Sequence, residues 1–408
     1  MFHGYPDGKT FPGPADTVQN GENSSDAIVP LISQSLAASC GPSHSHNAFV
    51  TQYAGGLMNG FNLSQCPEGT VYAYVPMSEL TAYWSIASNY GMASHVLQLN
   101  QGPSFPAHQQ LIAGQAGGID NSTGGFTSDP WGFVENGGIK SGTGSGGHTQ
   151  CGSPAGTAVT RIQLNSAFPG IEGSKAYPCY DVQTIFDIVA AKGLTWRYYG
   201  NKAGGLWSGP QAIKHLYNSP NYTVGGPAFF GDIAAGKLAN VTYIMPAAQW
   251  SDHPSRHYKV ASDGPNWVGN IIDAVGASPY WNSTAIVVTW DDWGGFYDHY
   301  KPVLGKATGT YGFRVPLLVA SAYSKPGAVD AQDTSQAAIL RLIEGTFKLG
   351  EGSLLSADSW TSDDLTTLLD FTAPPRAFVK IPVTEPPSYF KCKGCSNDAG
   401  GPDDGIDG

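Results

Sequence analysis

Two adjacent carboxylates, Asp291 and Asp292, have the sequence context of a catalytic or metal-binding pair. They follow the β-branched run IVVTW, which predicts a strand buried on both faces, and they precede Gly294 and Gly295. The carboxyl end of such a strand is where open α/β sheets bind ligands. Both carboxylates can reach one metal ion only if the backbone turns, which the two glycines permit. The alternative is a structural cap of a strand-ending turn.

Ser104 is a candidate nucleophile in the segment GPSFPAHQQLIAG, where a Gly-Pro turn precedes a predicted short helix. A hydroxyl beside helix N–H groups lies where a phosphate can be held and its developing charge stabilised. Serine is also among the most favoured helix-capping residues. By its local sequence alone, Ser104 therefore fits a cap as well as a nucleophile.

Several loop histidines could assist such chemistry. His44 and His46 occur in GPSHSHN, and His253 occurs in SDHP. Imidazoles there could bind phosphate oxygens, protonate a leaving group or ligate metal. A loop histidine is more often simply solvated, and HxH alone is a poor metal signature. Asp298 and His299, in FYDHY, could equally form a structural pair that supports the aspartate turn.

The elements needed to position these residues alternate along the chain. Helical patterns cover residues 78–89, 180–193, 265–278 and 334–350, and strand patterns cover 90–99, 194–200, 283–290 and 313–323. This alternation predicts an α/β fold with a mainly parallel sheet flanked by helices. The sequence predicts one domain over 1–370, with a Gly-rich loop or lid excursion at about 114–178 and no regular structure over 114–152. Residues 371–408 are expected to form a Pro-rich tail.

Composition narrows the class of protein. The chain has 408 residues, 41% of them hydrophobic, which is enough for a large core and excludes a disordered or fibrous protein. A net charge of -11 opposes binding to nucleic acid or to an anionic membrane surface. No apolar run approaches transmembrane length and no signal peptide opens the chain.

The cysteines indicate an oxidising compartment. Their number is six, an even count in a chain poor in lysine, which fits a secreted, periplasmic or cell-surface protein. The pairing cannot be read from the sequence. Cys392 and Cys395 form a CxxC without a second pair at zinc-site spacing, so a local disulfide is expected there.

Taken in order, the motifs resemble the phosphoesterase family of bacterial-type phospholipases C and acid phosphatases, which has an alkaline-phosphatase-like α/β core. The resemblance covers most of the chain. It is carried by GPSHSHNAFVTQYAGGLMNGF, SELTAYWSIASNYGMAS, GPSFPAHQQLIAG, CYDVQTIFDIVAAKGLTWRYY, FFGDIAAGKLANVTYIMP, SDHP, TWDDWGGFYDHY and GFRVPLLVASAYSKPG.

The resemblance implies roles for individual residues. Ser104 matches the family's nucleophile and a metal ligand, and Asp291 and Asp292 match its acidic metal-binding pair. His253 matches a phosphate-site histidine, and His44 resembles another site histidine. The implied cofactor is a divalent metal ion that lowers the pKa of the serine hydroxyl, and the implied intermediate is a phosphoserine.

Three further residues, His46, Asp298 and His299, are expected to support the site from outside it.

The start of the chain departs from the family's pattern. Family members usually begin with an apolar strand and a Glu-Asn-Arg-Ser-Phe-Asp-like segment, and the opening FHGYPDGKTFPGPADT resembles the stretch directly after that segment. We therefore expect an N-terminally truncated sequence with weak or absent activity.

The function expected from these observations is hydrolysis of phosphoric esters, of the phosphomonoesterase (acid phosphatase) type. A phospholipase C that cleaves phosphodiester lipids is the first alternative, since the sequence does not separate the two. A second alternative is an inactive protein that keeps only the phosphate-binding pocket. The expected partners are a phosphate ester or phospholipid substrate, and not nucleic acid.

Overall fold

The computed structural model describes residues 1–5, 18–37, 40–116, 131–135, 151–152, 159–163, 171–200, 208–254, 263–302 and 311–390. The CxxC of Cys392 and Cys395 and the acidic C-terminal run lie outside these ranges. Most of the opening segment lies outside them as well. The elements that position the candidate site residues all lie within them.

The central sheet has the order β12-β13-β5-β14, with β15 also paired to β5. Its strands are β5 (Gly91–Leu97), β12 (Ala285–Thr289), β13 (Arg314–Ser321), β14 (Ala328–Asp330) and β15 (Thr334–Ser335). β13 runs antiparallel to both of its neighbours, whereas β14 and β15 run parallel to β5. The expected α/β class is confirmed.

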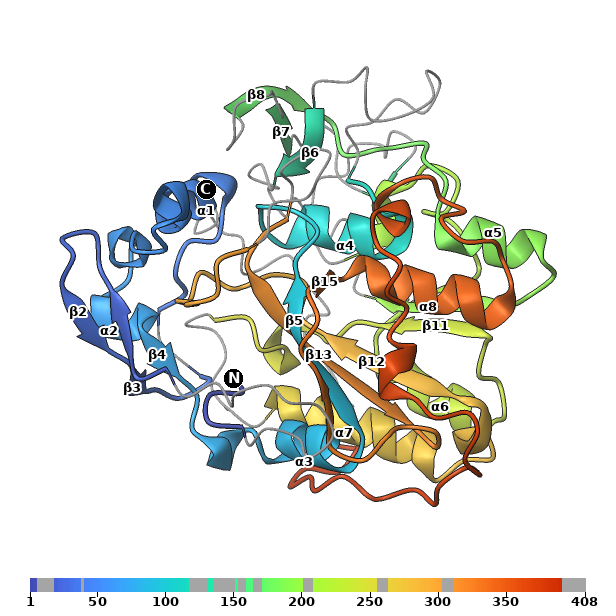
Figure 1. The fold of residues 1–408 in the computed structure, drawn as a ribbon. Coiled ribbons are helices and arrows are strands. Elements are labelled where there is room, and N and C mark those ends of the chain that lie inside the picture. Colours follow the sequence, from blue (N-terminus) through green and yellow to red (C-terminus); the bar gives the residue numbers. More distant parts are fainter. Residues whose placement is uncertain are drawn as a thin grey trace.

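Helices cover both faces of this sheet (Figure 1). They are α3 (Thr81–Asn89), α7 (Asp263–Gly276) and α8 (Ala337–Phe347). Alternate side chains of β13 point to opposite faces, so Leu318 packs in the cluster with α3 and α7 while Leu317 and Val319 pack in the cluster with α8. Burial on both faces explains why β13 is apolar at successive positions.

A second sheet has the order β10-β9-β11 and is entirely parallel. Its strands are β9 (Trp196–Gly200), β10 (Tyr222–Val224) and β11 (Val241–Ile244), and α5 (Ile185–Ala191) and α6 (Ala228–Ala234) lie beside it. Helix α5 begins with a capping box in which the Thr184 and Asp187 side chains each accept a backbone N–H. This is the helix–strand alternation that the sequence predicts.

The structure corrects one expectation about β12. The sequence predicts a strand buried on both faces, but within the described chain β12 pairs only with β13 and forms the edge of its sheet. Ala285 is exposed, and the residues from Ile286 to Thr289 are only half-buried. The apolar pattern correctly identifies a strand, but sequence periodicity does not report how many neighbours a strand has.

Around the two sheets lie smaller elements. They are β1 (Asn20–Glu22), β2 (Ile28–Pro30), β3 (Ile32–Ser33), β4 (Ala73–Tyr74), α1 (His46–Tyr53) and α2 (Glu68–Val71). A disulfide between Cys40 and Cys66 crosses this region. Closing a loop of this length stabilises the fold by roughly 3–4 kcal/mol in the chain-entropy description.

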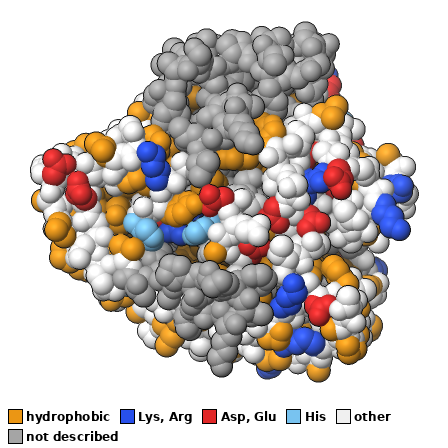
Figure 2. Space-filling view, viewed as in Figure 1, with side chains coloured by type: hydrophobic (Ala, Val, Ile, Leu, Met, Phe, Trp, Pro, Cys, Tyr) orange, Lys and Arg blue, Asp and Glu red, His pale blue; other side chains and the backbone are white. Residues whose placement is uncertain are grey.

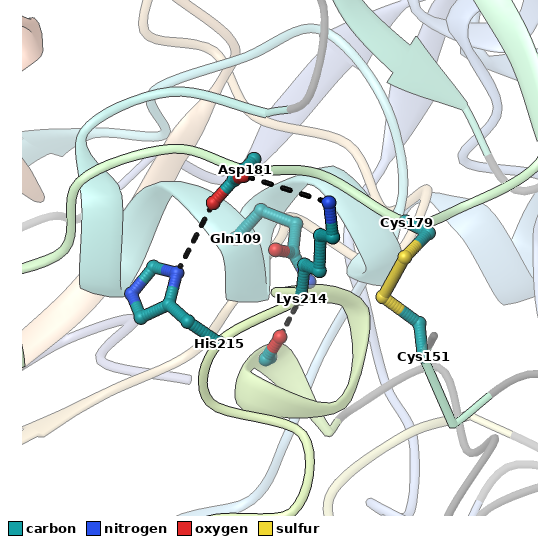
Figure 3. Close-up of a disulfide and its surroundings, with 7 residues drawn as sticks. Gln109, Cys151, Cys179, Asp181, Lys214 and His215 are labelled. Atoms are coloured by element: carbon teal, nitrogen blue, oxygen red, sulfur yellow. Dashed lines mark hydrogen bonds and ion pairs between the residues drawn. A yellow bond between two sulfur atoms is a disulfide. The ribbon is translucent and has the colours of Figure 1, made fainter. Parts of the chain in front are cut away.

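The Gly-rich excursion contains regular structure that the sequence does not predict. Strands β6 (Trp131–Glu135), β7 (Val159–Gln163) and β8 (Ile171–Ala176) form an antiparallel sheet. The alternating runs WGFVE and VTRIQ suit strands, but the surrounding Gly and Ser residues dilute that signal. A second disulfide, Cys151–Cys179, ties this region close to helix α4 (Ser104–Ala113) and to the ion pairs of Asp181 with Lys214 and His215 (Figure 3).

The part of the tail that the structure describes, residues 371–390, packs on the domain without forming a helix or strand. Ile381 and Phe390 are buried, and the Ile381 amide donates to the Asp273 carboxylate of α7. Among the described helices, none has the length and apolarity needed to cross a bilayer.

Candidate functional site

The aspartate pair lies on a sharp turn at the end of β12, as the sequence predicts. The Gly294 amide donates to Asp292 Oδ1 at 2.7 Å. Gly294 and Gly295 have φ values of 64° and 78°, a left-handed conformation that favours glycine. This turn lets two adjacent carboxylates reach one region, which a regular strand would prevent.

Ser104 is the first residue of helix α4 (Ser104–Ala113), and its hydroxyl does not cap the helix. Instead Ser104 Oγ donates to Asp292 Oδ2 at 3.2 Å. The contact joins the start of α4 to the turn after β12, two segments far apart in the sequence. It weighs against the ordinary capping role and places the candidate nucleophile beside the candidate metal ligands.

His108 is a site residue that the sequence reasoning missed. It lies one helical turn after Ser104, so both side chains share a face of α4. His108 Nε2 is 3.2 Å from Asp291 Oδ2. Burial alone raises the pKa of Asp291, but the hydrogen bond and charge of His108 outweigh it and hold that pKa well below its usual range. The i, i+4 spacing between Ser104 and His108 is the sequence pattern that would have identified His108.

His44 and His253 come together on the other side of Asp292. His44 Nε2 lies 3.9 Å from Asp292 Oδ2, while its Nδ1 lies 3.0 Å from the Pro42 carbonyl oxygen. The His44 and His253 rings contact edge to face with centroids 5.3 Å apart. Two of the predicted loop histidines therefore lie together beside the aspartate pair.

The three predicted supporting residues lie farther out. His46 Nδ1 is 3.2 Å from the Gln101 carbonyl oxygen, in the turn that leads to Ser104. Asp298 is held by Arg314, whose Nε and Nη2 donate at 2.9 and 2.6 Å. His299 Nδ1 is 3.9 Å from Asp298 Oδ1. Asp298 thus has the geometry of a structural ion pair.

A further carboxylate, Asp252, links the site to helix α3. Its Oδ2 accepts from Tyr83 Oη at 2.7 Å and from Trp290 Nε1 at 2.9 Å. Burial raises the pKa of Asp252 to about 6, although both hydrogen bonds oppose the shift. Trp290 directly precedes the aspartate pair, so Asp252 helps to fix the end of β12. The sequence reasoning singled out only its neighbour His253.

Access to these groups is uneven. Asp291, Asp292, His108 and His253 line a cavity of about 1190 Å³. Ser104 itself is buried, with 1% of its surface exposed. Figure 2 shows histidine, acidic and basic side chains beside exposed apolar ones near the middle of one face.

The oxygen donors of the site suit a hard divalent cation. Asp291, Asp292 and Ser104 offer carboxylate and hydroxyl oxygens, which such ions prefer. Among the residues that the structure describes, no group of three or more His, Cys, Asp or Glu side chains is placed to hold a metal ion. The three oxygens fit part of a coordination sphere.

Known proteins with similar sequences include several phospholipases C. Non-specific phospholipase C6 of Arabidopsis thaliana is 28% identical over 215 residues, covering 45% of this chain and 40% of that protein. Non-hemolytic phospholipase C of Pseudomonas aeruginosa is 27% identical over 236 residues, covering 48% and 34%. This chain therefore spans less than half the length of either relative.

Among solved structures, a protein in the alkaline phosphatase superfamily from Vibrio parahaemolyticus matches with a TM-score of 0.37 and 12% identity, covering 83% of this chain and 69% of that one. At this score the superposition says nothing about the site. The model of the Phosphoesterase family matches residues 13–350, which is most of the sequence. This chain belongs to the Phosphoesterase family.

Proposed function

We propose that the chain is a phosphoric ester hydrolase in which Ser104 is the nucleophile. The observation that carries this proposal is the contact between Ser104 Oγ and Asp292 Oδ2 at the first residue of α4. A serine in that position has a carboxylate to orient its hydroxyl and helix N–H groups to face an incoming phosphate.

In the proposed reaction, Ser104 Oγ attacks phosphorus and the bond from phosphorus to the leaving alcohol breaks. The hydroxyl proton passes to Asp292, and the leaving oxygen takes a proton from water; Asp292 returns its proton to Ser104 Oγ when the intermediate is hydrolysed. Water then attacks the phosphoserine and releases phosphate or a phosphomonoester, which regenerates Ser104. The N-terminus of α4 and His253 stabilise negative charge on the phosphoryl oxygens.

Asp291, Asp292 and Ser104 are the residues that would hold a divalent cation. When bound there, such a cation lowers the pKa of the serine hydroxyl and offsets charge on the phosphoryl group. His108 fixes the orientation of Asp291 from the outer side, 3.2 Å away. His44 does the same for Asp292 from 3.9 Å.

The substrate class rests on the relatives. Both relatives described above carry the name phospholipase C, which favours a phospholipid diester over the phosphomonoester expected from the sequence. The cavity that Asp291 and Asp292 line is also lined by apolar side chains such as Leu111, Trp293 and Phe296, which suit an amphipathic substrate. The two disulfides support a compartment outside the cytosol, in agreement with the expected secretion.

The test compares the chain with Ser104→Ala and with Ser25→Ala, which changes an exposed serine in the turn between β1 and β2. Hydrolysis of a phosphocholine diester and of an aryl phosphomonoester is measured with and without added divalent cation. We expect weak, cation-dependent turnover that Ser104→Ala removes and Ser25→Ala preserves. A phosphorylated Ser104 peptide, trapped at acidic pH and detected by mass, would identify the intermediate.

Turnover that survives Ser104→Ala would contradict the assignment of the nucleophile. Absence of turnover in every protein, with inorganic phosphate still bound in a calorimetric titration, would favour the non-catalytic phosphate-binding protein. Faster hydrolysis of the monoester than of the diester would favour a phosphomonoesterase of the acid phosphatase type over a phospholipase C.

A further inference from the structure

A buried glutamine links the two halves of the candidate site. Gln336 directly precedes α8 and is 0% exposed. Its side-chain oxygen accepts a hydrogen bond from the Leu99 amide at 3.2 Å. Its side-chain nitrogen donates to the carbonyl oxygens of Trp290 and Asp291, at 2.8 and 3.1 Å. One side chain therefore joins the segment after β5 to the turn that carries the aspartate pair.

The two N–H donors and the oxygen of the Gln336 amide are all used in this link. A primary amide has two N–H donors on its nitrogen and an acceptor oxygen. The nitrogen faces two carbonyl oxygens and the oxygen faces an N–H group, so a flipped amide would place like groups against each other at all three contacts. This complementarity fixes the orientation of the side chain, and with it the separation of the two segments.

The backbone of Gln336 is fixed as well. Its amide donates to the Leu97 carbonyl oxygen of β5 at 3.1 Å, directly after the two residues of β15 that pair with β5. Its carbonyl oxygen accepts from the Ile339 amide in the first turn of α8, also at 3.1 Å. Gln336 thus lies at a strand–helix junction that is hydrogen-bonded on both sides. Side chains on such rigid elements are placed more precisely than side chains on loops.

Further amides join the loop at residues 99–103 to helix α4. Asn100 Oδ1 accepts from the Gly102 amide at 2.7 Å, and Asn100 Nδ2 donates to Gln110 Oε1 of α4 at 2.5 Å. Gln110 Nε2 in turn donates to the Leu99 carbonyl oxygen at 3.3 Å. These bonds make the loop and the start of α4 one unit, so a displacement at Leu99 is passed on to Ser104.

The Gln336 link does not use the reacting groups. Ser104 Oγ donates to Asp292 Oδ2, and both of these groups change partners when the serine attacks phosphorus. Gln336 binds only backbone N–H and C=O groups of the two segments, and these take no part in the proposed reaction. Its hydrogen bonds can therefore persist while bonds at Ser104 form and break.

We propose that Gln336 is a positioning residue for the reaction proposed above, on which this inference rests. It holds the turn that carries Asp291 and Asp292 at the separation from Ser104 that attack on phosphorus requires. A misplacement of about 1 Å in an active site lowers a rate by about 10²-fold. The rate of attack depends on this separation more than substrate binding does. Loss of the link should therefore lower kcat and leave KM nearly unchanged.

The experiment compares Gln336→Met and Gln336→Asn with the control Gln109→Met. Methionine keeps the volume of glutamine and removes its hydrogen bonds. Asparagine keeps the amide but is one methylene shorter, and it serves if Gln336→Met does not fold. Gln109 of α4 is also buried, but its amide donates to the Gly209 carbonyl oxygen at 3.1 Å, near the Cys151–Cys179 disulfide (Figure 3).

Two readouts are taken on each protein. Hydrolysis of a phosphocholine diester is measured with added divalent cation, well below the melting temperature of each variant. We expect kcat to fall about 10²-fold in the Gln336 variants, with KM within about twofold of wild type and Gln109→Met close to wild type. Hydrogen exchange is followed by mass spectrometry in peptides that cover residues 98–104 and 290–295. Exchange in both peptides should be faster in the Gln336 variants than in Gln109→Met.

Equal kinetics and equal exchange in Gln336→Met and Gln109→Met would overturn the proposal. A fall in kcat that disappears on cooling would also overturn it, because that fall would reflect loss of folded protein. If no protein hydrolyses the ester, the proposed function fails and the exchange readout tests the link by itself. Faster exchange of both peptides in the Gln336 variants alone would then support the link, and equal exchange would contradict it.

Discussion

Asp292 and Asp298 lie in one short segment after β12, but they have different kinds of partner. Asp298 is clamped by two guanidinium nitrogens of Arg314, at 2.9 and 2.6 Å. Asp292 instead accepts from a serine hydroxyl and faces His44. Because the permanent charge of Arg314 neutralises Asp298, this pair holds the segment after β12 to the start of β13. A hydroxyl and an imidazole leave a carboxylate able to orient a nucleophile or bind a cation.

The largest effect that we expect is the loss of chemistry in Asp292→Asn. An amide cannot accept the serine proton or supply a carboxylate to a cation, so hydrolysis should fall by about 10³-fold or more. The melting temperature should change little. A turnover assay and a thermal melt of the same variant measure this. Asp298→Asn is the comparison, because it should lower stability more than turnover. Retained turnover in Asp292→Asn would remove the distinction between the two aspartates.

The next largest effect is on stability, in Asp298→Asn. Removing one member of this half-buried pair takes the carboxylate away from the Arg314 guanidinium, which should lower the free energy of unfolding by about 3 kcal/mol. The double variant Asp298→Asn, Arg314→Met should recover part of the loss. Denaturant unfolding of the two variants measures this, and an equally unstable double variant would contradict the ion-pair explanation.

The Asp298 pair also has a definite pH dependence. Burial opposes ionisation, but the charge and hydrogen bonds of Arg314 lower the pKa of Asp298 below its ordinary value of 3.8. A lowered folded-state pKa means that the pair contributes stability above pH 3.8, which is lost as the pH falls below that value. Acid unfolding of wild type should therefore approach that of Asp298→Asn at low pH.

Asp252 gives an effect of the opposite sign, because its burial outweighs both of its hydrogen bonds and the attraction of the N-terminal ammonium group. Burial raises its pKa to about 6, so between pH 3.8 and 6 the folded state holds a proton that the unfolded state has released. Stability is greatest below this window and falls as the pH rises through it, by up to about 3 kcal/mol. Asp252→Asn should remove this slope in melts recorded from pH 3.5 to 7. A slope that persists in the variant would assign it to other groups.

The smallest effect is expected for His108→Gln, which tests the other half of the site. The glutamine amide matches the position of His108 Nε2 and can still donate to Asp291 but carries no positive charge, so hydrolysis should fall about tenfold, and the fall should appear mainly in kcat. His215→Gln is the control, because His215 lies between the exposed Asp181 and the half-buried Asp187, near the Cys151–Cys179 disulfide (Figure 3). Equal losses in both variants would mean that His108 acts only through stability.

Much of the local structure follows from patterns within single segments. The strand before the aspartates, the glycine turn after them and the helix that begins at Ser104 are all readable from periodicity and turn residues. The three-stranded sheet in the Gly-rich excursion is not, because its short runs lie among residues that favour loops. The sheet-edge position of β12 is also not readable, since it depends on pairing between distant strands.

By itself the sequence determined the α/β class, the family and the residue types available for chemistry, because these depend on short-range patterns and on ordered motifs. Only the tertiary structure decided which groups meet. It brought His108 to Asp291, assigned Asp298 to Arg314 and placed β11 and β12 along one cavity. The physical reason is that hydrogen bonds and ion pairs act over a few ångströms in space, and separation along the chain carries little information about that distance.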